Sequence, residues 1–214
     1  MFSLTTKTSA NRATAGISGL WDSLRRSKLA GALTVFVLGV VSLGAWAMSS
    51  PSGSEPDSDF HLASIWCTTA GPASPCDMEE RRNQKTVPTT LIEARCFSQD
   101  QNASAACQPL MTTADGRETM TNRLNIVESK ANYPSGFFLA YNLFASSNVD
   151  TSVFAMRLIG ATLFVGLNVL LWWFLPTRLK NPLVWGWMGT LVPLGMFIIP
   201  STNPSSWSII GVGS

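Results

Sequence analysis

The sequence has little charge. Only 13% of its 214 residues are Asp, Glu, Lys or Arg, against about a quarter in typical soluble domains. The apolar residues, 46% of the total, gather in three runs that are almost free of charge. Even mixing would be typical of a soluble core, so this distribution indicates that lipid forms part of the solvent.

Acidic residues are absent from most of the chain. Apart from Asp22, every Asp and Glu lies between Glu55 and Asp150, and basic residues dominate the remainder behind a formal charge of only +2. No basic run with interleaved aromatic residues occurs, which is the pattern that a nucleic-acid binder needs. Nucleic acid is therefore excluded as a partner.

The first apolar run, 29–48, holds no charge. As a helix it would reach about 30 Å, one hydrocarbon thickness, which predicts a transmembrane helix. Residues 1–28 carry five Lys or Arg and few large apolar residues, a composition typical of a flexible tail. A signal peptide cleaved near Ala45-Trp46-Ala47 is the alternative, but its basic region would be unusually long.

Two further apolar runs follow the polar middle. Residues 153–175 predict a second transmembrane helix, whose one charge, Arg157, lies a turn from its start and can snorkel to the interface. After a short basic connection at 176–182, residues 183–199 predict a third. Trp185 and Trp187 suit its interfacial end, and its Gly and Pro residues are tolerated where neighbouring helices resatisfy the backbone.

Basic residues near the spans predict the orientation. Five Lys or Arg precede the first helix, and Arg178 and Lys180 lie between the second and third, so both segments are expected in the cytoplasm. The fold class is then an α-helical polytopic membrane protein of the cell membrane, with about three transmembrane helices. A large disulfide-containing extracytoplasmic loop, 49–152, follows the first helix, and 200–214 is an outer segment in which a fourth helix starts.

All four cysteines lie in the predicted outer loop: Cys67, Cys76, Cys96 and Cys107. That placement is typical of an oxidising compartment. Four cysteines allow three pairings, and pairing neighbours, Cys67 with Cys76 and Cys96 with Cys107, would close two short loops. Free thiols and a zinc site are the alternatives, but no Cys-x-x-Cys spacing occurs and the one histidine lies outside the cysteine span. No metal site is predicted.

A short amphipathic helix is expected after Pro56. Phe60, Leu62, Ile65 and Trp66 recur at near-helical spacing, with Leu91, Ile92 and Phe97 as further packing residues. Ser54 would be its N-cap and Pro56 an early helical residue. Asp57 and Asp59 would lie in its first turn, where acidic groups favour the helix dipole. Helix capping is thus a sufficient explanation of both aspartates.

Three motifs carry a family resemblance. Glu55-Pro-Asp-Ser-Asp-Phe-His61 resembles the Pro-Asp-Glu-x-x-His signature of a bacterial membrane family, domain of unknown function 2142. Asn132-Tyr-Pro-Ser-Gly-Phe-Phe138 resembles its Tyr-Pro-Pro segment, and Asn203-Pro-Ser-Ser-Trp207 its outer-face motif after the third helix. Their order and predicted side agree with the family. Asp59 departs from the pattern, standing at a shifted position where the family usually has Glu.

The family resembles the C-type glycosyltransferases, which move a sugar from a polyprenyl-phosphate carrier at the outer face of the membrane. Carried onto this chain, the resemblance implies that Asp57 is the acidic residue that acts in catalysis, with Asp59 as an auxiliary and His61 one turn later. The carboxylate would take the acceptor hydroxyl proton or hold a divalent cation. A polyprenyl-phosphate-linked sugar, an envelope glycan and membrane lipid are the implied partners.

The same resemblance places substrate-binding residues at Tyr133, Asn203, Ser205 and Ser206. Asn203 can cap a helix that starts at Pro204, and the backbone N–H groups of the two serines would then receive a carrier phosphate. An ordinary helix start at the membrane surface is the alternative.

Family members typically have many more spans, so an amino-terminal portion that is inactive alone is expected. A non-catalytic membrane component, whose outer loop binds a partner or envelope polymer, is the second hypothesis. A transporter is the third, and it would use the polar residues of the spans, Arg157 and Asn168.

Overall fold

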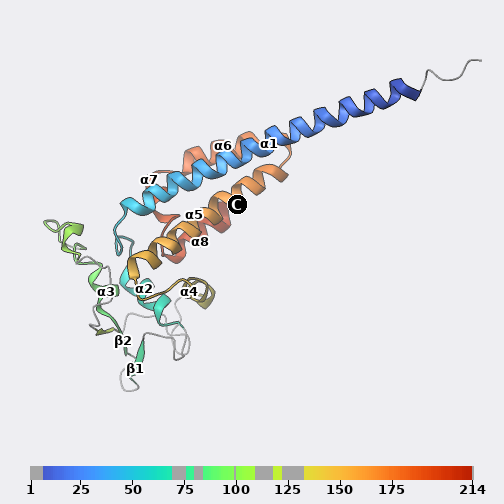
Figure 1. Ribbon diagram of the computed structural model, residues 1–214. Helices are drawn as coiled ribbons and strands as arrows, with labels where there is room; N and C mark the ends of the chain where they lie inside the picture. The colour runs from blue at the N-terminus through green and yellow to red at the C-terminus, as the bar shows by residue number, and fades with distance from the viewer. Residues whose placement is uncertain are drawn as a thin grey trace, which may run out of the picture. The chain divides into compact units, whose positions relative to one another are not determined.

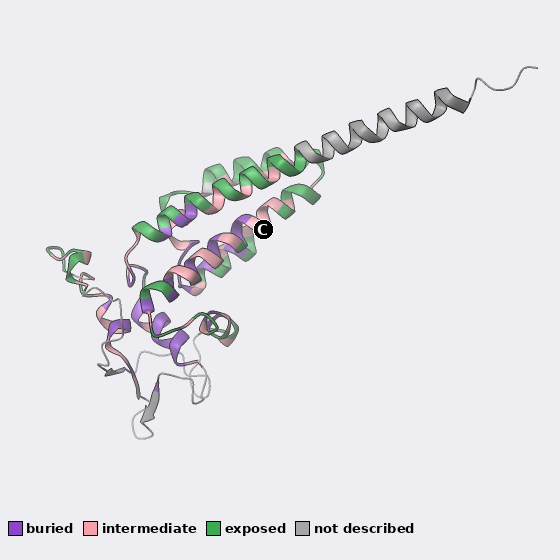
Figure 2. Ribbon diagram, in the orientation of Figure 1, coloured by how far each residue is buried: buried purple, intermediate pink, exposed green. Residues whose placement is uncertain are grey.

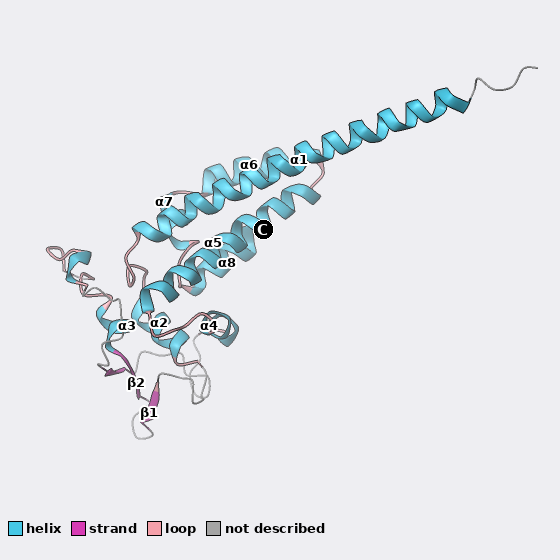
Figure 3. Cartoon of the chain, viewed as in Figure 1, coloured by secondary structure: helices cyan, strands magenta, loops and turns pink. Residues whose placement is uncertain are grey.

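The computed structural model describes residues 7–68, 76–79, 84–98, 100–108, 118–121 and 133–213, which are mainly helical with one small sheet (Figure 3). The chain divides into two units, Met1–Gly39 and Val40–Ser214. The elements are α1 Lys7–Ser49, α2 Ser58–Trp66, β1 Asp77–Glu79, β2 Gln84–Pro88, α3 Thr89–Glu93, the 3-10 turn η1 Ala105–Cys107, β3 Glu118–Thr121, α4 Ser135–Asn142, α5 Val149–Phe174, α6 Thr177–Thr190, α7 Pro193–Ile198 and α8 Pro204–Gly213 (Figure 1).

Two of the described helices are long and apolar enough to cross a membrane, within Lys28–Ser49 and Val149–Phe174. They are candidate membrane helices by length and composition, and they coincide with the first two runs predicted to span. The flexible tail predicted at 1–28 is wrong from Lys7 onward, because α1 already begins there. No proline interrupts Lys7–Ser49, and each residue added to an existing helix gains a hydrogen bond at little cost.

The third apolar run is not one helix. α6 begins at Thr177, inside the predicted connection 176–182, and ends at Thr190; α7 resumes at Pro193. Val192 between them is extended, with φ −75° and ψ 166°. A proline disfavours helical backbone in the residue before it and has no N–H for the preceding turn. Pro193 therefore breaks the helix at this point.

The end of α1 lies close to the start of α5. We call this side of the helices the loop side, because the loop 50–148 connects the two helices there. Ser52 Oγ donates a hydrogen bond to Asp150 Oδ1 at 2.8 Å. Leu43 and Ala47 of α1 are buried, and a Cβ at Gly44 would lie 3.7 Å from Cδ1 of Leu158 on α5. The loop-side ends of both helices thus lie at the same level.

α2 is the centre of the core on the loop side, buried around nearly its whole circumference (Figure 2). The predicted amphipathic helix exists, but it is not amphipathic in its surroundings: even Ser58 and Ser64 are at most 2% exposed. Leu62, Ile65 and Trp66 pack with residues of α3, α4 and α5. Burial on all sides requires each polar group of α2 to find its partner within the protein.

The two predicted disulfides are confirmed. Cys67 joins Cys76 with their Cα atoms 5.5 Å apart, and Cys96 joins Cys107 with their Cα atoms 6.1 Å apart. The sequence did not indicate the antiparallel sheet, whose strand order is β1-β2-β3.

Gly53 begins the turn that leads to α2. Its φ of +81° favours glycine, and a Cβ there would lie 2.4 Å from the carbonyl oxygen of Ala94. Gln108 donates from Nε2 to that same oxygen and to the carbonyl of Ser52, which binds the turn to the segment that carries Cys107.

Candidate functional site at the start of α2

A buried ion pair fixes the chain between α1 and α2. Arg157 of α5 donates to Glu55 Oε1 from Nε at 2.8 Å and from Nη2 at 2.5 Å. It also donates to the carbonyls of Ala47, Ser50 and Pro51, which close α1. Arg157 is only 3% exposed. The predicted snorkelling to water is wrong, because protein oxygens satisfy the guanidinium instead.

Asp57 occupies the N-cap position of α2 in a left-handed conformation, with φ 54° and ψ 29°. It is the only non-glycine residue of the described segments with positive φ. Its side chain makes no capping hydrogen bond to α2, and Ser54 is not the N-cap that the sequence predicted. Backbone strain of about 1–3 kcal/mol persists only where the surroundings impose it, and such strain concentrates at functional sites.

The two aspartates differ in their surroundings. Asp57 is exposed, whereas Asp59 is buried in the first turn of α2. Arg95 Nη1 donates to Asp59 Oδ1 at 2.5 Å, and its Nη2 donates to Ser98 at 3.2 Å. Asp59 therefore joins α2 to the segment after α3, and Asp57 is the carboxylate that faces solvent.

His61 lies one turn after Asp57 and is 1% exposed. Its ring centroid is 5.4 Å from that of Tyr133, and it stacks on Phe138 at 6.2 Å. Burial lowers the pKa of His61 to about 4, although Asp57 and Asp59 act in the opposite direction. Nδ1 is buried without a hydrogen-bond partner. A neutral imidazole with an unused polar atom therefore stands behind the exposed carboxylate.

Asn203 joins the start of α8 to the start of α2. Its Nδ2 donates to the carbonyl of Pro56 at 3.1 Å, and its Oδ1 accepts from the Ser205 N–H at 2.9 Å. The predicted cap of a helix that starts at Pro204 is thus formed. The Ser206 N–H donates to the Asn203 carbonyl at 2.9 Å. Both serine N–H groups are engaged, so a phosphate would have to replace these bonds.

Aromatic residues connect α4 with α8. Trp207 Nε1 donates to the Tyr141 hydroxyl at 3.3 Å, and its ring meets Phe137 edge to face at 5.2 Å. Burial raises the pKa of Tyr141. Hydrogen bonding to Trp207 and Ser206 has the opposite, smaller effect of lowering this pKa. Trp207 belongs to a quoted motif, but Tyr141 carried no signal in the sequence.

Polar residues of the spanning helices serve packing. Asn168 of α5 donates to the Phe164 carbonyl at 2.9 Å and accepts from Trp187 Nε1 at 2.7 Å. Trp187 also meets Phe164 edge to face, so it is half-buried against α5, whereas Trp185 is exposed. Arg157 and Asn168 both make hydrogen bonds within the protein. The transporter hypothesis depended on these two polar residues of the spans, so it loses its support.

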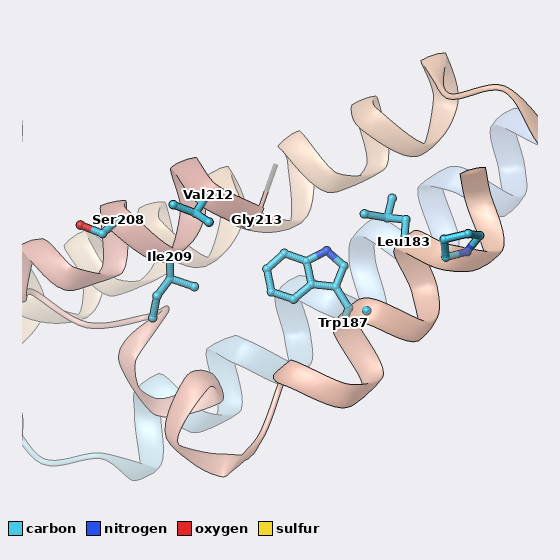
Figure 4. Close-up of a pocket in the computed structure, with 8 residues that line it drawn as sticks. Leu183, Trp187, Ser208, Ile209, Val212 and Gly213 are labelled. Atoms are coloured by element: carbon cyan, nitrogen blue, oxygen red, sulfur yellow. The ribbon is translucent and has the colours of Figure 1, made fainter. Parts of the chain in front are cut away.

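An apolar cleft of about 660 Å³ separates α6 from α8. Figure 4 shows the Trp187 indole in it, facing Ile209 and Val212 across the gap, with Leu183 on its own helix. Ser208 has the one side-chain hydroxyl of the lining. Among the described residues, no three His, Cys, Asp or Glu side chains gather to hold a metal ion.

Two apolar helices of spanning length, a disulfide-bridged loop between them and a polar cluster at their loop-side ends define a helical membrane protein. The model of one family, described as predicted membrane protein (DUF2142), matches residues 40–214. The chain belongs to that family. No curated protein matches the sequence, and no solved structure matches the chain.

Proposed function

We propose that the chain is part of a lipid-carrier-dependent glycosyltransferase of the cell envelope, with its reaction centre at Asp57. One observation carries the proposal: the strained, exposed Asp57 belongs to one of the three segments that the family motifs single out, and that segment contacts the other two. Asn203 is bonded to the residue before it, and His61, one turn later, contacts Tyr133. Strain in a polar cluster is more often kept for function than for packing.

The topology proposed with it is a path of three crossings, with the loop side outside the cell. The basic residues support this orientation: Arg178 and Lys180 lie at the opposite end of α5, where Lys180 stands 4.2 Å from the ring centre of Trp172. α6 and α7 together would make the third crossing. Gly160 of α5 supports this return, because a Cβ there would lie 3.2 Å from the Ile199 carbonyl.

In the proposed reaction, the oxygen of an acceptor hydroxyl forms a bond to the anomeric carbon of the carried sugar. The bond from that carbon to the phosphate oxygen breaks, and the polyprenyl phosphate leaves with the electron pair. Asp57 takes the hydroxyl proton, so charge and atoms balance.

The other residues have supporting roles in this proposal. Asp59 is held by Arg95 and does not act as a second base. His61, neutral at pH 7, is buried and supports the site by packing against Tyr133 and Phe138. Tyr133 supplies a ring on which a sugar can rest. On α8 the apolar cleft is lined from Ser208 onward, roughly 8 Å along the helix from Asn203 at 1.5 Å per residue, and it would take the hydrocarbon tail of the carrier.

Asp57→Asn tests the proposal in membranes that contain the complete protein. The assay supplies a panel of polyprenyl-phosphate-linked sugars, each with a radiolabelled sugar, and measures label in envelope glycan. Removal of a general base predicts a loss of about 10²-fold or more, with polyprenyl-phosphate binding in nanodiscs retained. Asp100→Asn, the same change at an exposed carboxylate outside the site, should leave transfer intact. Full transfer by Asp57→Asn would contradict the proposal. It would favour the second hypothesis, a non-catalytic membrane component.

A further inference from the structure

α4 has two different apolar faces. Phe137, Phe138 and Tyr141 point into the core and are at most 5% exposed. Leu139 is 46% exposed, Leu143 in the following turn is 81% exposed, and Phe144 is 42% exposed. A helix that is apolar on both faces has two apolar neighbours, of which the protein core is only one.

The exposed face lies close to the level at which the spanning helices end. The Ser146 N–H donates to Ser152 Oγ at 3.0 Å, and the two hydroxyls are 2.8 Å apart. The turn after α4 is thus bonded to the first turn of α5. Asp150, in the same first turn of α5, accepts a hydrogen bond from Ser52, which follows α1. The first turn of α5 is therefore close to the loop-side end of α1. Leu143 and Phe144 lie only a few residues before it in the chain.

Charge is absent from this part of the chain. α4 has no acidic residue in its first turn and no basic residue in its last, and 133–149 contains neither type. Further along α5, exposed Leu163, Leu167 and Leu170 form the surface that a spanning helix turns to lipid. Leu143 and Phe144 precede Val149, the first residue of that helix, by six and five positions.

We propose that α4 and its following turn form an interfacial anchor, in which Leu139, Leu143 and Phe144 enter the acyl-chain boundary of the bilayer on the loop side. The partner is membrane lipid, because the turn after α4 is bonded to the first turn of a candidate spanning helix and 133–149 has no charge for an aqueous or protein partner to pair with. The inference rests on family membership and geometry, and it is independent of the proposed glycosyltransferase.

The anchor would also set the height of the candidate site. The buried face of α4 contacts His61 through Phe138 and Trp207 through Tyr141. Because one helix touches lipid on one face and the site on the other, the anchor fixes α2 close to the headgroups, where a ligand with a hydrocarbon tail is reached without leaving the bilayer.

Nitroxide accessibility in lipid nanodiscs tests the anchor. Leu143→Cys and Ser147→Cys are made singly in the full chain with its disulfides oxidised, and each is labelled with a nitroxide. Both positions are exposed, so neither change disturbs the core. We expect the label at 143 to be reached by oxygen in preference to a water-soluble nickel chelate, and the label at 147 to show the reverse.

Two outcomes would overturn the anchor. Equal nickel accessibility at 143 and 147 would place the face in water. Low accessibility of the label at 143 to both reagents would indicate a protein neighbour, and spin–spin broadening at that position would identify it as a second copy of the chain.

Discussion

The side-chain amide of Asn203 donates a hydrogen bond to the carbonyl of Pro56, 147 positions earlier in the chain. The same side chain caps α8 through its oxygen. One residue therefore couples the backbone before Asp57 to the helix that follows the third apolar run, and its two bonds can be separated by substitution.

Asn203→Asp should loosen the start of α2 while leaving the start of α8 in place. An aspartate keeps the acceptor for the Ser205 N–H but has no N–H to give to Pro56. Hydrogen exchange in nanodiscs should be faster in peptides covering 53–62 and unchanged in those covering 204–213. Asn203→Ala, which loses both bonds, should accelerate exchange in both. Unchanged exchange at 53–62 in Asn203→Asp would show that the bond to the Pro56 carbonyl does not stabilise the start of α2.

Arg157→Gln should destabilise the protein more than the double change Arg157→Gln with Glu55→Gln. The single change leaves the Glu55 carboxylate buried without its partner, at a cost of roughly 3–5 kcal/mol, whereas the double change removes the charge as well. Thermal unfolding in one detergent gives the order of the three proteins. A double variant no more stable than the single one would contradict this account of the pair.

Gly53→Ala should fail to fold or lose stability by at least the roughly 1–3 kcal/mol that a strained backbone costs. Positive φ and the Ala94 carbonyl both oppose a Cβ at this position. Gly136→Ala is the matched control, because a Cβ at Gly136 meets nothing within 4 Å. Yields of folded protein after size-exclusion chromatography compare the two; equal yields would mean that the turn can rearrange.

His61 should stay neutral well below pH 6.5. Its pKa is lowered from 6.5 to about 4 in the folded state, so between these values the unfolded chain binds more protons. Stability contributed by His61 is present above pH 6.5 and is lost as the pH falls toward 4. The chain has one histidine, so a sample with ¹³C-histidine and no histidine tag gives one titration curve. A midpoint near 6.5 would mean that the ring is solvated.

Reductant should open Cys96–Cys107 before Cys67–Cys76. Cys67 and Cys76 are 5% and 8% exposed, whereas both members of the other pair are exposed, and exchange requires access to the sulfur. Stepwise reduction, alkylation and peptide mass spectrometry give the order. Earlier alkylation of Cys67 would show that α2 opens more readily than its burial indicates.

The sequence predicted what depends on local composition. Two runs of the right length, one uncharged and one with Arg157 as its single charge, became parts of α1 and α5, and cysteines close in sequence became the disulfides. It failed where a distant partner decides. Arg157 reads as a snorkelling residue until Glu55, 102 positions earlier, is placed beside it. The left-handed Asp57 was missed because an aspartate before a helix ordinarily caps it.

The candidate site was predictable as a set of segments but not as a geometry. Motifs indicated that Asp57, Tyr133 and Asn203 belong together and matched Asp57 to the catalytic position. They did not indicate that Asp57 is exposed while Asp59 is paired with Arg95. The polar strands β1 to β3 have no apolar alternation strong enough to predict a sheet.

The two disulfides join cysteines only 9 and 11 positions apart, and this spacing bears on the order of assembly. In a chain that enters the membrane from its amino terminus, with the loop side outward as proposed, both pairs reach the oxidising compartment before α5 has been synthesised. Neither bridge has to wait for a distant segment. Covalent closure of the loop is a local event, whereas packing of α2 against α4 and α5 must come after the second spanning helix is in place.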